Sequence, residues 1–210
     1  MLRDHHAIKM LKAGMRTGMA TVAGIVTVAT MILLAGACDR SYTPKPPGYL
    51  RVDYPEKSYE IYDGQPFYRF EIPTYAIVQR DSSPGADPGW INLVIPDLNG
   101  TIHLSYKPVT GNLGAYITDS RTLAYKHTVK AEGIEESPFI ERERRRYGMV
   151  YDLKGDVASA VQFFITDSTT HFLRGSLYFN AAPNRDSLNP VIDFLRKDII
   201  HLIETTEWKY

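Results

Sequence analysis

The stretch "RRYGMVYDLKGDVASAVQFFITDSTTHFLRGSLYF", residues 145–179, decides the fold. It contains three apolar runs, residues 145–153, 158–166 and 171–179, joined by "KGD" and "DSTT". Apolar and polar side chains alternate within the runs, the period of a half-buried strand. Connections of this length join antiparallel neighbours in hairpins. The stretch therefore predicts a three-stranded antiparallel meander.

Upstream of the meander the same signals predict two further strand pairs. Residues 59–62 and 67–72 are separated by "DGQP", and residues 90–95 and 101–106 flank "PDLNG". Gly, Pro, Asn and Asp clusters between apolar runs are typical of turns. These four runs therefore add strands before the meander.

Two segments have helical spacing instead. The first follows Asn112, a candidate N-cap, through apolar residues up to Ala124, and Gly133 follows its expected end. The second follows Asn189 as the expected N-cap, with Pro190 in the first turn. Its apolar stripe consists of Val191, Phe194, Leu195, Ile199, Leu202 and Ile203.

The order of strands, helix, meander and helix predicts an α+β fold, with a central antiparallel sheet covered by helices, in one domain of residues 49–210. By element order alone this arrangement is similar to the PsbP and Mog1 domains. Element order carries no information about function.

The N-terminus has the pattern of a secretory signal. Basic residues precede 21 uncharged positions, residues 17–37, which end in small side chains before Cys38, the one cysteine of the chain. This pattern predicts a lipoprotein signal at residues 1–37, removed before acylation of Cys38. Leu34 lies four residues before the cysteine, whereas the usual lipobox places Leu three before it.

Two other interpretations of this segment stay open. Twenty-one uncharged residues are long enough for a retained transmembrane anchor, because about 20 suffice. A plain cleaved signal is the third. Residues 38–48, with the prolines of "SYTPKPPG", predict an extended tether between Cys38 and the domain.

The composition of the mature chain excludes some classes of protein. Residues 38–210 carry 20 Lys and Arg against 23 Asp and Glu, about −3, so no basic footprint for nucleic acid is present. A single cysteine excludes an internal disulfide. The domain must therefore be stabilised by its core.

Catalytic and metal-binding patterns are weak. The histidines of the mature chain are His103, His127, His171 and His201; none pairs at i, i+4, so we expect no metal or other cofactor. A triad of Ser105 or Ser159 with His171 and Asp167 is conceivable, but no GxSxG motif surrounds a serine. We therefore expect no enzyme.

Three further features have a structural and a functional interpretation. "ERERRRYG", residues 141–148, is either a solvated edge or loop, which we favour, or a patch for an acidic partner or lipid headgroups. "NAAPNRDSLNP", residues 180–190, is a helix lead-in or a partner-binding loop. Arg174, on a predicted strand, is a paired internal charge or a recognition residue.

Several long segments carry a family resemblance. They are "YTPKPPGYLRVDYPEKSY", "WINLVIPDLNGTIHLSYKPV", "DSRTLAYKHTVKAEGIEE" and "QFFITDSTTHFLRGSLYFNAAPNRDSLNPVIDFLRKDI". Together they resemble the gliding motility lipoprotein GldD family of the Bacteroidota, over residues 38–208. The loose lipobox is the main departure from the family pattern.

The resemblance implies a lipid-anchored envelope protein that faces the periplasm, more often at the outer membrane, and serves gliding and type IX protein secretion. Its implied partners are the membrane and other gliding and secretion lipoproteins. The resemblance supplies no catalytic residue, so only Cys38 is transferred as a functional position. The alternative expectation is an extracytoplasmic lipoprotein that binds glycan, lipid or peptide.

Overall fold

The computed structural model describes residues 53–126, 131–181 and 184–210, all within the unit Tyr49–Tyr210. The predicted signal, Cys38, the tether and His127 lie outside these residues. Ten strands and two α-helices are described. The strands are β1 (Tyr59–Tyr62), β2 (Tyr68–Pro73), β3 (Ile77–Arg80), β4 (Ile91–Ile95), β5 (Gly100–Pro108), β6 (Ala131–Glu141), β7 (Arg146–Gly155), β8 (Val161–Thr166), β9 (His171–Phe179) and β10 (Glu207–Trp208). The helices are α2 (Leu113–Tyr125) and α3 (Arg185–Thr205), with a short 3-10 turn η2 (Pro96–Leu98).

Seven of these strands form one antiparallel sheet in the order β3-β4-β5-β9-β8-β7-β6. The predicted meander β7-β8-β9 is present, with Phe163 opposite both Val150 and Gly175. Strand β9 then pairs along its whole length with β5. The α+β prediction is therefore confirmed: an antiparallel sheet carries two helices.

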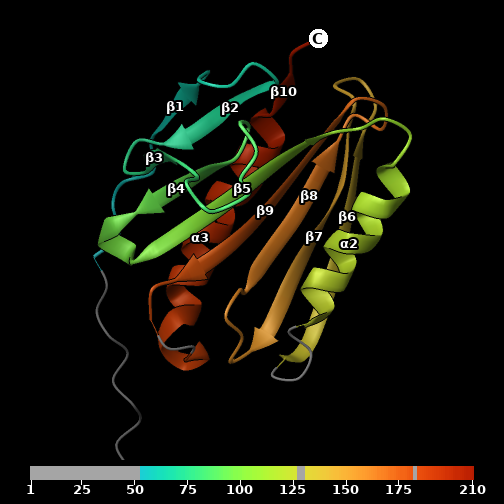
Figure 1. The fold of residues 1–210 in the computed structure, drawn as a ribbon. Coiled ribbons are helices and arrows are strands. Elements are labelled where there is room, and N and C mark those ends of the chain that lie inside the picture. Colours follow the sequence, from blue (N-terminus) through green and yellow to red (C-terminus); the bar gives the residue numbers. More distant parts are fainter. Residues whose placement is uncertain (1–52, 127–130, 182–183) are drawn as a thin grey trace, which may run out of the picture. The chain divides into compact units, whose positions relative to one another are not determined.

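The two helices lie on opposite faces of this sheet (Figure 1). Leu195, Ile199 and Leu202 of α3 are almost fully buried and belong to the same core as the inward residues of β5, β8 and β9. Helix α2 lies over β8 and β9 on the other face. The period-2 alternation of the strands thus supplies an apolar face for α3 and a more polar face for α2.

A second sheet, β1-β2-β10, packs through β2 against α3. The link is a buried charge: Asp198 on α3 is 2% exposed. It accepts hydrogen bonds from Lys57 Nζ at 2.5 Å, Tyr59 OH at 2.9 Å and Tyr75 OH at 2.6 Å. The carboxylate of Asp198 therefore connects the segments around β1 and β2 to α3.

Two helix predictions need correction. Helix α3 begins at Arg185, not after Asn189, because Asn184 caps it by accepting a hydrogen bond from Ser187 N at 3.3 Å. Pro190 consequently lies inside the helix. Residues 185–190, predicted as a lead-in or a partner-binding loop, are helical.

Three strands were not predicted: β3, β6 and β10. Gly133 lies within β6, an edge strand rich in glutamate that pairs with β7.

Among the described residues no helix is both long and apolar enough to span a bilayer.

Candidate functional site

The residues of the conceivable triad are not brought together. Ser105 lies on the α2 face of the sheet, opposite Arg174, whereas its neighbour Tyr106 points to the other face and bonds to His171. Ser159 precedes β8 and Asp167 follows it. Eight residues at about 3.3 Å each separate those two positions by roughly 25 Å. Neither serine can therefore complete the triad.

Asp167 has a structural role in the β8–β9 turn. Its Oδ1 accepts hydrogen bonds from the backbone N–H groups of Thr169, Thr170 and His171 at 2.8–3.0 Å. Burial alone would raise the pKa of Asp167, but these N–H groups outweigh it and hold the pKa at about 2. The carboxylate thus stabilises the turn, and its hydrogen bond from His171 comes from the backbone N–H, whereas Nδ1 of the imidazole bonds to Tyr106.

The ring of His171 lies in an aromatic cluster. Tyr106 OH is 2.8 Å from its Nδ1, and Trp208 stacks on it at 5.1 Å between centroids. Burial lowers the pKa of His171, although Asp167 acts in the opposite direction. Its Nε2 is buried without a partner among the described residues. The cluster joins β10 to the main sheet.

The other described histidines are also separate. His103 lies 2.7 Å from Asn92 Oδ1, and His201 lies 2.7 Å from Glu71 Oε2 while stacking on Tyr59. The described part of the chain contains no group of three His, Cys, Asp or Glu side chains placed to hold a metal ion.

The charged segment 141–148 spans the end of β6, a turn at residues 142–145 and the start of β7, and the four turn residues are exposed as predicted. Arg146 departs from that prediction, because it is 3% exposed. Its Nη1 donates to carbonyl oxygens at the end of α3, those of Ile203 at 3.1 Å and of Glu204, while Nη2 bonds to Glu141. A cation at the C-terminus of a helix complements the helix dipole.

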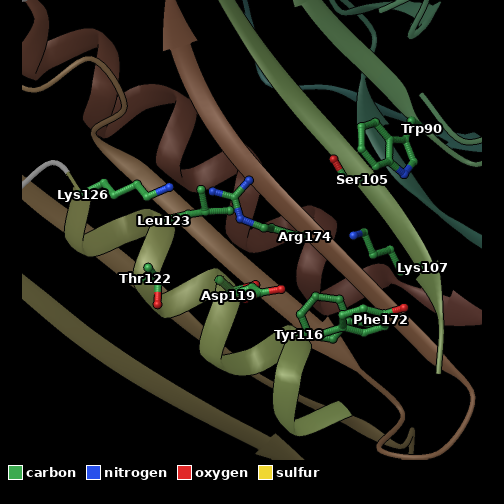
Figure 2. A pocket seen from close by; sticks show the side chains of 11 residues that line it. Trp90, Ser105, Lys107, Tyr116, Asp119, Thr122, Leu123, Lys126, Phe172 and Arg174 are labelled. Atoms are coloured by element: carbon green, nitrogen blue, oxygen red, sulfur yellow. The ribbon is translucent and has the colours of Figure 1, made fainter. Parts of the chain in front are cut away.

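The main candidate site is a pocket of about 490 Å³ between α2 and strands β5 and β9. We call it the α2 pocket; Figure 2 shows it with most of its lining side chains labelled. Trp90, Tyr116, Leu123 and Phe172 supply apolar surface. Lys107, Lys126, Arg174 and Asp119 are its charged side chains. Lys107 Nζ also lies 5.2 Å from the centre of the Tyr116 ring.

Arg174 sits on β9 at the inner side of this pocket, where its guanidinium points toward Leu123 of α2 and Lys126, the residue after the helix (Figure 2). Its Nη2 donates to Gln162 Oε1 at 2.6 Å. Burial lowers the pKa of Arg174, and the nearby Tyr178 and Tyr151 act against that shift. Because its bonded partner is a neutral amide, Arg174 is not a paired internal charge; its role as a recognition residue stays a prediction.

Sequence reasoning missed the α2 pocket because its residues are scattered over segments 90–126 and 172–174. The alternation around Arg174 placed it on one face of a strand. Which helix covers that face depends on the topology.

Comparisons with known proteins add a family assignment. The family model described as gliding motility lipoprotein GldD matches residues 39–208. A similar solved structure is the solution structure of cyanobacterial PsbP (CyanoP) from Synechocystis sp. PCC 6803, with 13% sequence identity, a TM-score of 0.41, and coverage of 73% of this chain and 98% of that chain. At that TM-score the likeness carries no functional weight. No curated protein matches the chain.

Proposed function

We propose that the chain, which belongs to the gliding motility lipoprotein GldD family, is a membrane-anchored, non-enzymatic assembly or stabilising factor for gliding motility and type IX protein secretion. The observation that carries this proposal is the family match, which extends through every strand and helix of the described domain. Membership places the chain among lipoproteins of the cell envelope.

The anchor in this proposal is Cys38. The family match begins at residue 39, immediately after Cys38. This start is expected if Cys38 is the first residue of the mature chain. Each buried methylene contributes about 0.8 kcal/mol to membrane binding, and stable anchoring takes more than one acyl chain. A triacylated Cys38 would hold the domain on the membrane, facing the periplasm, with residues 38–48 as the tether. We place it at the outer membrane.

A scaffolding role is supported by the way the candidate catalytic residues are used. Asp167 stabilises a turn, His171 packs in an aromatic cluster, and Ser105 lies on the opposite face of the sheet. In this proposal the domain acts through contacts with other gliding and secretion lipoproteins and envelope proteins.

The test is quantitative proteomics of culture medium and outer membrane from a clean deletion strain, with the wild-type gene restored as control. The proposal expects many secreted proteins to fall together, envelope partner proteins to decrease, gliding to stop where the bacterium glides, and complementation to restore all of these. An unchanged secretome with normal partner levels would overturn it.

A second candidate function is favoured by the α2 pocket. An envelope lipoprotein with a lined cavity of about 490 Å³ could bind glycan, lipid or peptide. Cavities of roughly 300–1,000 Å³ are typical of small-molecule sites. Ligand binding and assembly do not exclude each other.

A further inference from the structure

The three cations that line the α2 pocket are the half-buried Arg174 and Lys107 and the exposed Lys126, and they differ from three buried or half-buried cations elsewhere in the domain. Elsewhere a carboxylate accompanies each: Lys57 has Asp198, Arg196 has Asp152 and Arg146 has Glu141. Among the described residues, Arg174, Lys107 and Lys126 have no carboxylate within ion-pairing distance. The pocket lining therefore carries three positive charges against one negative charge, that of the exposed Asp119.

The position of Arg174 makes this uncompensated charge significant. Withdrawing a charge from water is costly unless it is paired and hydrogen-bonded. Gln162, itself 1% exposed, accepts one hydrogen bond and fixes the guanidinium, but its amide is neutral. The guanidinium has five N–H donors in a fixed fork, a geometry that matches a carboxylate.

The rest of the lining indicates which kind of molecule would carry such a carboxylate into the pocket. The rings of Trp90, Tyr116 and Phe172 offer flat apolar surface. The indole N–H of Trp90 already donates to Tyr106 O at 2.9 Å, so its ring face is what it offers to a ligand. Asp119, an exposed carboxylate at the rim, and Ser105 can accept hydrogen bonds from hydroxyl groups.

We propose that the α2 pocket binds an acidic sugar, a hexuronic acid unit of an envelope glycan, with its carboxylate on Arg174 and its ring against the aromatic side chains. Lys107 and Lys126 add long-range attraction at the rim. Asp119 and Ser105 receive the sugar hydroxyls. This inference gives the ligand chemistry of the second candidate function and rests on it. It does not depend on the assembly role, which the deletion proteome tests separately.

The test is a titration of the purified protein with methyl glucuronoside, followed by Trp fluorescence and calorimetry at low salt. The matched neutral probe is the corresponding glucuronamide, which keeps the ring and loses the charge. We expect saturable binding of the acid, at least tenfold weaker binding of the amide, and weakening of the acid's affinity as salt screens the pocket.

Four variants connect that binding to the pocket. Arg174→Gln removes the proposed carboxylate partner, and we expect at least a tenfold loss of affinity. Arg174 is partly buried, so its substitution can also disturb the fold. Lys126→Ala, at an exposed position, and Ser105→Leu, which narrows the pocket, therefore test the site independently. We expect weaker binding of the acid by each. Lys197→Ala on exposed α3 surface is the matched control and leaves affinity unchanged.

Several outcomes would overturn the proposal: equal affinity for acid and amide, no binding of the acid at millimolar concentration, or affinity unaffected by all three pocket variants. Tighter binding of N-acetylphenylalanine than of methyl glucuronoside would show that the pocket prefers a peptide C-terminus to an acidic sugar. That result would also overturn the proposal.

Discussion

Replacing Asp167 with asparagine tests whether the β8–β9 turn depends on an ionised carboxylate. The turn holds the pKa of Asp167 at about 2, against an ordinary value of 3.8. Each pKa unit corresponds to about 1.36 kcal/mol, so this shift amounts to about 2.4 kcal/mol of folding free energy at neutral pH. Asp167 is fully buried, and solvent therefore screens little of that contribution.

The sign of the pH dependence follows from the depressed pKa. The contribution is fully present above pH 3.8 and is lost as the pH falls toward 2, because the unfolded state binds the proton first. Asp167→Asn keeps an oxygen that accepts from the N–H groups but loses the charge. We expect the variant to be about 2 kcal/mol less stable at pH 7 and to approach the wild type near pH 2.

Urea unfolding between pH 7 and pH 2, followed by the intrinsic fluorescence of Trp90 and Trp208, measures both stabilities. Asp87→Asn in the exposed loop before β4 controls for the loss of one negative charge. A variant as stable as the wild type at pH 7, or a deficit that stays constant down to pH 2, would refute the reasoning.

Three more changes test the packing. Asp198→Ala leaves Lys57 without its carboxylate, and urea unfolding should show a loss of about 3 kcal/mol; a loss below 1 kcal/mol would contradict the role of Asp198. Gly175→Ala places a methyl group against the ring of Phe163, so thermal unfolding should show a loss of about 2 kcal/mol, and an unchanged melting temperature would argue against this close packing. Ser159→Ala removes a buried hydroxyl that has no partner among the described residues. It should keep or slightly raise stability and complement a deletion strain fully, whereas loss of function in a folded variant would revive a catalytic role.

The strong periodic segments made the core of the fold predictable. Strands β2, β4, β5, β7 and β9 lie within two residues of the predicted bounds, whereas β8 begins at Val161, three residues after the predicted start at residue 158. Their alternation of apolar and polar side chains reflects one face packed on a core, a local pattern that tertiary structure reinforces.

The differences between the predicted and the observed elements have physical causes. Strand β6 carries many glutamates because it is an edge strand, so its pattern differs from that of a half-buried strand. The start of α3 was misplaced because Pro190 suits a first helical turn, yet Asn184 supplies the cap that the structure uses. The charged neighbours of Arg146 predict an exposed side chain, because only the folded chain brings the end of α3 to it.

The candidate site was less predictable than the fold. Arg174 was identified as a residue with two interpretations, and the choice between them depends on which side chains α2 brings near it. No sequence motif marks Lys107, Trp90 or Phe172, because a pocket built from several distant segments leaves no local pattern.

The central claim is that the protein acts as a lipid-anchored envelope factor, and Cys38→Ser at the chromosomal gene tests it most directly. One experiment would follow incorporation of labelled palmitate, partition between membrane and soluble fractions, and recovery of secreted proteins. The account predicts that the variant loses the label, leaves the membrane fraction and reproduces the secretion defect of the deletion strain. A variant that remains membrane-bound with full secretion, or a wild-type protein that never takes up the label, would contradict it.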